Sequence, residues 1–212
     1  MRRRSIQAGL WWGAALATLV TTAAWFGANE VGIPAFDREG LTLANVWRTP
    51  WLDAAFLGLT WLGSLMVLLP LVLAAGILLW RRGYRGEARF LMAALVGASL
   101  LAQMAKHLAL RQRPDLFAAL TWVASPLSFP SAHAVQATAV AVSSLVVVAR
   151  LAPRHVHWAA PLLISVLLLV GLSRIHLQVH FPSDVLAGSI AAGFWVAGLH
   201  ALTLTANPAA DT

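Results

Sequence analysis

Six long apolar stretches constrain this chain more than any other feature of its sequence. They run over residues 8–28, 62–80, 90–110, 132–149, 157–174 and 185–205. Each has about 17 to 22 residues, enough for an α-helix to cross a hydrocarbon core about 30 Å thick. Hydrophobic residues make up 59% of the 212 residues and charged residues only 11%, against about 25% charge in a soluble domain. The sequence therefore predicts an all-α, polytopic membrane protein, a bundle of six transmembrane helices.

The chain shows no internal boundary. No change of composition and no internal repeat divides it, so residues 1–212 are interpreted as a single transmembrane domain. The first apolar stretch is longer than the apolar part of a signal peptide, which has about 7 to 15 residues, so we expect a retained helix. Residues 52–61 look amphipathic and predict a short helix in the membrane interface.

The arginine residues predict the topology. They gather at residues 2–4, 81–89 and 150–154, three places that parity puts on one side of the membrane. The positive-inside rule assigns this side to the cytoplasm, so both termini are expected there, in a bacterial-type inner membrane. The same distribution accounts for much of the formal charge of +7, and we expect no nucleic-acid partner. The chain has no cysteine, which excludes disulfides and thiolate metal sites.

Three polar clusters lie on the opposite, external side, at the ends of apolar stretches. They are Lys106 with Arg113-Pro114, the segment Pro130-Ser131-Ala132-His133, and Ser173-Arg174 with His180 and Asp184. Charged groups beside lipid are costly and usually indicate function. The positive-inside rule does not explain the three cations among them. We therefore expect an active site at the external membrane face that binds an anion.

The three cations suit a phosphate ligand. A lysine acts as a point charge, whereas an arginine offers a planar fork of N–H donors. Lys106, Arg113 and Arg174 are thus candidate phosphate ligands. For Lys106 alone, an ordinary side chain that extends to the membrane interface remains an alternative.

The second cluster predicts the start of a helix. Ser131 is placed to be the N-cap of the fourth span, which would leave backbone N–H groups free to bind an anion. His133 follows within the first turn, where an imidazole could protonate the oxygen that leaves a phosphate ester. Plain helix capping with a hydrogen-bonded histidine is the alternative.

The third cluster predicts a nucleophile. If a helix starts at Pro182 or Ser183, the carboxylate of Asp184 can reach one ring nitrogen of His180 and leave the other free to attack phosphorus. A metal site is the alternative, because His176, His180 and Asp184 are spaced four residues apart. Pro182 argues against it, since a continuous helix through these residues would be broken there. We expect no metal and no cofactor.

In order and spacing, the clusters resemble the three signature motifs of the type 2 phosphatidic acid phosphatase (PAP2) family: Lys106-x6-Arg113-Pro114, Pro130-Ser131-x-His133 and Ser173-Arg174-x5-His180-x3-Asp184. The resemblance covers residues 106–184 and the six-helix plan. It implies a metal-independent lipid phosphatase in which His180 is the nucleophile, Asp184 orients it and His133 is the general acid.

The resemblance also implies a phosphate-binding set. Its members are Lys106, Arg113, Ser131, Arg174 and the backbone N–H of Ala132. The family usually has glycine where this chain has Ala132. Alanine keeps the N–H donor, but its methyl group could narrow the pocket.

The expected reaction is hydrolysis of a membrane lipid phosphate or diphosphate through a phosphohistidine. Undecaprenyl diphosphate is the first choice of substrate, because compact six-span members of the family resemble the enzymes that recycle this carrier. Phosphatidylglycerophosphate, phosphatidate and lipid A phosphates remain alternatives. So do transfer of the phosphoryl group to another hydroxyl, a transporter whose charges line a path, and a catalytically inactive lipid-binding relative. The sequence does not predict an oligomeric state.

Overall fold

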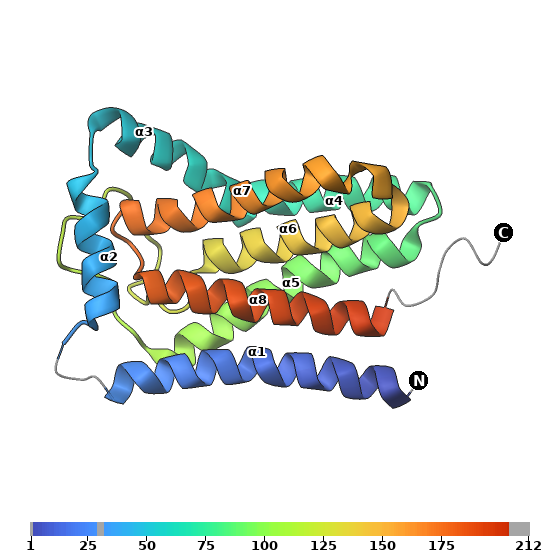
Figure 1. Cartoon of the computed structure of the whole chain (residues 1–212), viewed down its shortest axis with the longest axis horizontal. Helices are drawn as coiled ribbons and strands as arrows, with labels where there is room; N and C mark the ends of the chain where they lie inside the picture. Colours follow the sequence, from blue (N-terminus) through green and yellow to red (C-terminus); the bar gives the residue numbers. More distant parts are fainter. Residues whose placement is uncertain (1, 29–31, 204–212) are drawn as a thin grey trace.

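The computed structural model describes residues 2–28 and 32–203, and all regular secondary structure in these ranges is helical. The elements are α1 (Arg2–Ala28), α2 (Ala35–Val46), α3 (Pro50–Leu59), the 3-10 turn η1 (Thr60–Gly63), α4 (Leu65–Arg81), α5 (Arg85–Ala109), α6 (Ala132–Leu151), the 3-10 turn η2 (Pro153–His155), α7 (Val156–His176) and α8 (Pro182–Thr203). The six long helices run along the long axis of the molecule, and α2 and α3 lie at one end (Figure 1).

The long helices correspond to the six predicted spans. Within the described residues, five helical segments are each long and apolar enough to cross a membrane, and they lie on α1, α5, α6, α7 and α8. A sixth candidate is the pair Pro50–Gly63 and Leu65–Arg81, which is bent by 44°. With this pair counted as one span, the predicted six-helix membrane bundle is confirmed. The long helix of this span, α4, begins at Leu65 instead of residue 62, because Ser64 is extended and caps α4 by accepting a hydrogen bond from the Met66 N–H.

The segment between the first two spans forms two helices, of which only one was predicted. The expected helix over residues 52–61 is α3, which begins at Pro50 behind the N-cap Thr49. Helix α2 was not predicted. It buries Asp37 and Leu41 against the bundle and exposes Leu43 and other large apolar side chains. This pattern fits a helix that lies across the end of the bundle, as α2 does in Figure 1.

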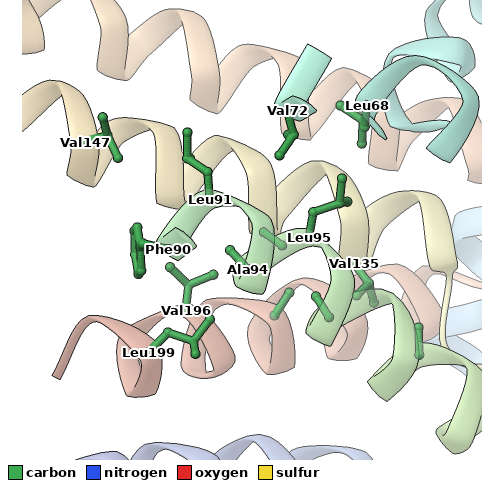
Figure 2. Packing of buried hydrophobic residues seen from close by; sticks show 14 residues of the cluster. Leu68, Val72, Phe90, Leu91, Ala94, Leu95, Val135, Val147, Val196 and Leu199 are labelled. Atoms are coloured by element: carbon green, nitrogen blue, oxygen red, sulfur yellow. The ribbon is translucent and has the colours of Figure 1, made fainter. Parts of the chain in front are cut away.

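Helix α5 packs against α4, α6 and α8. Its Leu91, Ala94 and Leu95 are buried against Val135 of α6 and Val196 of α8 (Figure 2). Lipid tails are as apolar as these side chains, so such helices associate through close packing, which small residues permit. The alanines along α5 allow this approach, and they fix the positions of α6 and α8 relative to Lys106 at the end of α5.

Helix α1 packs along α8. The indole of Trp12 stacks on that of Trp195, with ring centroids 5.4 Å apart, and donates to the Trp195 carbonyl oxygen. A Cβ atom at Gly198 would overlap the Trp12 indole, so this crossing requires glycine. The contact places Phe26, near the end of α1, against Phe129 beside the second polar cluster.

All three polar clusters lie at one end of the molecule. There α5 and α7 end and α6 and α8 begin, next to α2 and α3 (Figure 1). The arginine-rich links, between α4 and α5 and between α6 and α7, lie at the opposite end (Figure 1). Segments distant in sequence therefore meet in one region.

Candidate active site

Backbone hydrogen bonds join the segments that carry the three clusters. The Ser128 N–H donates to the Arg111 carbonyl oxygen at 2.8 Å, which folds the 110–131 loop back on itself. The Ser131 N–H donates to the Asp184 carbonyl oxygen at 3.2 Å and joins the start of α6 to the start of α8. The N–H of His180 donates to the Arg174 carbonyl oxygen at 3.3 Å. These bonds bring the motif residues, which lie between positions 106 and 184, into a single site.

His180 and Asp184 form the centre of the site. Helix α8 begins at Pro182, as predicted, and the Nδ1 atom of His180 lies 3.4 Å from Oδ2 of Asp184. Both side chains are buried. The two atoms are close but not aligned as a hydrogen bond. Burial, and after it the charges of Arg174, Arg113 and Lys106, lower the pKa of His180 well below its usual value, so the ring is neutral.

Arg113 lies on the other side of the His180 ring. Its Nη1 atom is 3.2 Å from Nε2 of His180 and also contacts the Val179 carbonyl oxygen, while Nε donates to Ser125 at 2.7 Å. Burial lowers the pKa of Arg113, and Asp184 partly opposes this effect. Arginine stays protonated in proteins, so a positive charge stands beside Nε2 of His180.

Lys106 turns into the protein at the end of α5. Its side chain is buried, and Nζ donates to the carbonyl oxygens of Leu127 and Ser128, at 3.0 and 3.3 Å. It does not extend to the membrane interface. An ammonium group has three hydrogens, so one donor remains. Lys106 lies within electrostatic range of Arg113, Arg174 and Asp184.

Arg174 occupies the last turn of α7 and is buried. Its Nη1 atom donates to Oγ1 of Thr60 in η1 at 2.6 Å. Its Nε atom is buried and has no hydrogen-bond partner among the described residues. Buried donors are nearly always satisfied in proteins, so this N–H is a candidate ligand for a bound anion.

Ser131, Ala132 and His133 form the start of α6. Ser131 holds the predicted N-cap position, but its hydroxyl does not cap the helix, and among the described residues its buried Oγ has no partner. The backbone N–H of Ala132 is in the first position of the helix, where no intrahelical acceptor exists. His133 is half-buried, next to the backbone of Gly63, and within electrostatic range of Arg174, Arg113 and Lys106. The part of the alternative in which the Ser131 hydroxyl caps the helix is therefore wrong.

Two charged residues of the site were missed in the sequence. Arg111 donates to Oδ1 of Asp184 and to Oδ2 of Asp37, both at 2.6 Å. Asp37 comes from α2 and is fully buried. Arg111 stands only two residues before Arg113, and a carboxylate in an apolar chain needs a partner. These two features could have drawn attention to Arg111 and Asp37, but nothing local in the sequence indicates that they pair with each other.

The three residues of the alternative metal site do not share a helix. Helix α7 ends at His176, and residues 177–181 separate it from α8. The Nε2 atom of His176 instead lies 2.8 Å from Oδ1 of Asp53 in α3. Among the described residues, no group of three His, Cys, Asp or Glu side chains is placed to hold a metal ion.

Comparison with known proteins identifies the family. The model of the PAP2 superfamily matches residues 87–208. Phosphatidylglycerophosphatase B of Bacillus subtilis is 37% identical over 147 residues, which are 66% of this chain and 70% of that protein. The decaprenylphosphoryl-5-phosphoribose phosphatase of Mycobacterium tuberculosis is 42% identical over 93 residues, 43% of this chain and 47% of that protein.

Solved structures agree with this assignment. The crystal structure of the PAP2-type phosphatidylglycerolphosphate phosphatase of Bacillus subtilis superposes with a TM-score of 0.75 at 29% identity, over 87% of this chain and 92% of that one. LpxE of Aquifex aeolicus superposes with a TM-score of 0.62 at 27% identity, over 80% and 96% of the two chains. The chain therefore belongs to the PAP2 superfamily, as a multi-pass membrane protein of its lipid phosphatase type.

Proposed function

We propose that this protein removes the terminal phosphate of a lipid phosphate monoester, with phosphatidylglycerophosphate as the first candidate, through a phosphohistidine on His180. The proposal rests on the groups that surround the His180 ring. Asp184 lies beside Nδ1 and the Arg113 guanidinium beside Nε2. Lys106 and Arg174 lie within electrostatic range of the same ring. A neutral imidazole among three cations suits attack on an anionic phosphate.

The first step forms the phosphohistidine. With its proton on Nδ1 and facing Asp184, His180 attacks phosphorus with the Nε2 lone pair. The P–O bond to the lipid alcohol breaks as the P–N bond forms. His133 takes up a proton when the anionic phosphate binds beside it and gives this proton to the leaving oxygen, so the lipid departs as a neutral alcohol. Asp184 stabilises the positive charge on the His180 ring.

The second step releases phosphate. His133 is now neutral and accepts a proton from a water molecule, whose oxygen attacks phosphorus. The P–N bond breaks, its electron pair returns to Nε2 of His180, and inorganic phosphate leaves. His133 ends this step protonated, as it was before the P–O bond broke, so protons and electrons balance over the two steps.

The phosphate oxygens are bound by the donors that surround His180. Lys106, Arg113 and Arg174 supply the positive charge. Ser131 Oγ and Arg174 Nε support this role, because both are buried and have no partner among the described residues. The Ala132 N–H adds a backbone donor at the start of α6. These three cations neutralise the charge that a metal ion would otherwise balance, and we propose that turnover needs no metal.

The substrate is proposed from the relatives. The sequence alone favoured undecaprenyl diphosphate. The name and the extent of the Bacillus subtilis match favour phosphatidylglycerophosphate instead. A polyprenyl phosphate or diphosphate is the second candidate, because the mycobacterial relative is named for a decaprenyl substrate.

The membrane orientation is part of the proposal. The arginine-rich links lie at the end of the bundle opposite the site (Figure 1). By the positive-inside rule, that end faces the cytoplasm. The site then faces the exterior of a bacterial inner membrane, and both ends of the chain lie in the cytoplasm.

A phosphate-release screen tests the function. The purified protein in detergent is given phosphatidylglycerophosphate, undecaprenyl diphosphate, undecaprenyl phosphate and phosphatidate, with a chelator present. We expect the fastest release from phosphatidylglycerophosphate and no effect of the chelator. The His180→Ala protein should release none. Absence of release from every lipid would refute the function, and full activity of His180→Ala would refute the nucleophile.

A further inference from the structure

Arg111 links the catalytic pair to a helix outside the bundle. Its Nη1 atom donates to Oδ1 of Asp184 at 2.6 Å and to Oγ of Ser183 at 2.9 Å. Its Nη2 atom donates to Oδ2 of Asp37 in α2 at 2.6 Å. Only 10% of the Arg111 side chain is exposed, and both carboxylates are fully buried. The guanidinium thus bridges two carboxylates that have little access to water.

Two aromatic rings hold the plane of this guanidinium. The Cζ atom of Arg111 lies 3.6 Å from the ring centroid of Phe26 in α1 and 3.8 Å from that of Phe181. These two close ring contacts limit how the guanidinium can tilt, and its bonds to the two carboxylates limit how it can rotate. A lysine could supply the charge but neither the fork nor the stacking. The site is therefore built for arginine.

Helix α2 is docked on the same segment. Oδ1 of Asp37 accepts from the Ser183 N–H at 2.9 Å, and Oδ2 accepts from the Ser183 hydroxyl at 2.6 Å. The Gln178 side chain donates to the Leu41 carbonyl oxygen at 3.1 Å. Asp37 therefore contacts both Arg111 and the residue that precedes Asp184. These bonds fasten α2 to the chain on both sides of His180.

Both oxygens of Asp184 are placed by this arrangement. Oδ1 accepts from Arg111, and Oδ2 accepts from the Phe181 N–H at 3.0 Å while facing Nδ1 of His180. Without Arg111, the carboxylate would keep only uncharged donors, the Phe181 N–H and the Ser128 hydroxyl, and would lose the donor that holds Oδ1. It would also lose the positive charge that Arg111 places against it.

We propose that Arg111, held by Asp37, is a positioning residue for phosphoryl transfer: it fixes the carboxylate of Asp184 toward His180 and makes α2 part of the catalytic apparatus. This proposal rests on the proposed function of His180 and Asp184. Arg111 differs in role from Arg113, because three of its four Nη–H bonds already point at protein acceptors. It acts through Asp184 and not on the phosphate.

A double-mutant cycle with Asp184 tests the proposal in detergent-purified protein. We expect Arg111→Gln to lower kcat by about 10- to 100-fold, the loss usual when a group that orients a metal-bound histidine is removed from a metalloenzyme. KM should stay within about three-fold of the wild type. In the Asp184→Asn background the same change should lower kcat by less than about two-fold, because Arg111 has nothing left to orient. Multiplicative losses in kcat, or a rise in KM as the main effect, would overturn the proposal.

Three further variants separate positioning from folding. Arg111→Lys keeps a positive charge between the two carboxylates, so it should fold even if Arg111→Gln does not, and its kcat should still fall below that of the wild type. Asp37→Asn should lower kcat with KM little changed. Arg38→Gln, an exposed neighbour of Asp37 on α2, is the matched control and should behave as the wild type. Wild-type kcat in Arg111→Lys and Asp37→Asn would contradict the proposal.

The tautomer of His180 gives a readout that needs no substrate. In protein labelled with 15N at histidine, the His180 signals, assigned by comparison with His180→Gln, should report a proton on Nδ1 in the wild type. Arg111→Gln or Arg111→Lys should shift this tautomer population, and an unchanged spectrum would refute the proposal. If the spectrum shifts but the wild type hydrolyses no lipid phosphate, the proposed function fails while the positioning role stands.

Discussion

Asp184 accepts hydrogen bonds from both Arg111 and the Phe181 N–H, and its Oδ2 atom lies 3.4 Å from Nδ1 of His180. This last distance is longer than the usual range of about 2.7–3.2 Å for an N–H···O bond. Catalytic hydrogen bonds are commonly long until substrate is bound. A small rotation of the His180 ring would close the gap, because the carboxylate itself is held from two other sides.

Removing the charge of Asp184 should slow chemistry more than it weakens binding. We expect Asp184→Asn to lower kcat by about 10²- to 10⁴-fold, with KM changed little, because the variant no longer orients the ring or stabilises its positive charge. Steady-state phosphate release measures both constants. Glu39→Gln on the exposed face of α2 is the control carboxylate. An unchanged kcat in Asp184→Asn would remove the orienting role.

The backbone donor at Ala132 can be tested with two substitutions at one position. Ala132→Gly keeps the N–H and should stay within a few-fold of wild-type activity. Ala132→Pro removes the N–H, yet proline is favoured at the first position of a helix, and Ser131 before it is already extended. We expect this variant to fold and to lose about 10²-fold in kcat, as when one donor to a transition-state oxygen is removed. Equal activity of the two variants would show that the backbone N–H of residue 132 does not bind the phosphate.

The buried ring of His180 should make stability depend on pH. Burial and the nearby cations hold the pKa of His180 well below 6.5, so the folded protein stays unprotonated where the unfolded chain takes up a proton. The contribution of this group to the free energy of unfolding is therefore fully present above pH 6.5. Below pH 6.5 it falls by about 1.4 kcal/mol per pH unit. Reversible unfolding in mixed micelles at pH 7.5 and 5.5 should show this loss, and it should be smaller in His180→Gln. Identical pH dependence in both proteins would contradict the neutral ring.

The docking of α2 should matter for turnover as well as for stability. A Cβ atom at Gly40 would overlap the ring of Pro182, whereas one at Gly58 in α3 meets nothing within 4 Å. Gly40→Ala should therefore push α2 away from the start of α8, cost about 1–3 kcal/mol of stability and lower kcat. Gly58→Ala is the matched control and should do neither. If both variants behave as the wild type in unfolding and turnover, α2 does not support the site.

The spans and the motif residues were predictable because their signals are local. An apolar run such as residues 132–149 has the length of a membrane crossing, and Ser131 marks its start. Lys106, Arg113, His180 and Asp184 stood out as polar groups at the ends of such runs. The structure brings them together, and it places His133 within electrostatic range of the cations.

The links between the spans were not predictable from local pattern. Asp37 and Arg111 are 74 residues apart and pair only because α2 folds across the end of the bundle. Nor did composition indicate α2, whose buried face is small and includes a carboxylate. The contacts of Arg174 with Thr60 and of His176 with Asp53 were not predicted for the same reason, since each contact joins residues more than 100 positions apart.

Trapping the intermediate tests the central claim most directly. The protein is mixed with lipid substrate carrying 32P in its terminal phosphate, quenched in alkali within milliseconds and digested for mass spectrometry. We predict label on His180, stable in alkali and lost in acid, and none on the His180→Ala protein. Rapid release of phosphate by the wild type with no label on His180, or with label on another residue, would contradict the account.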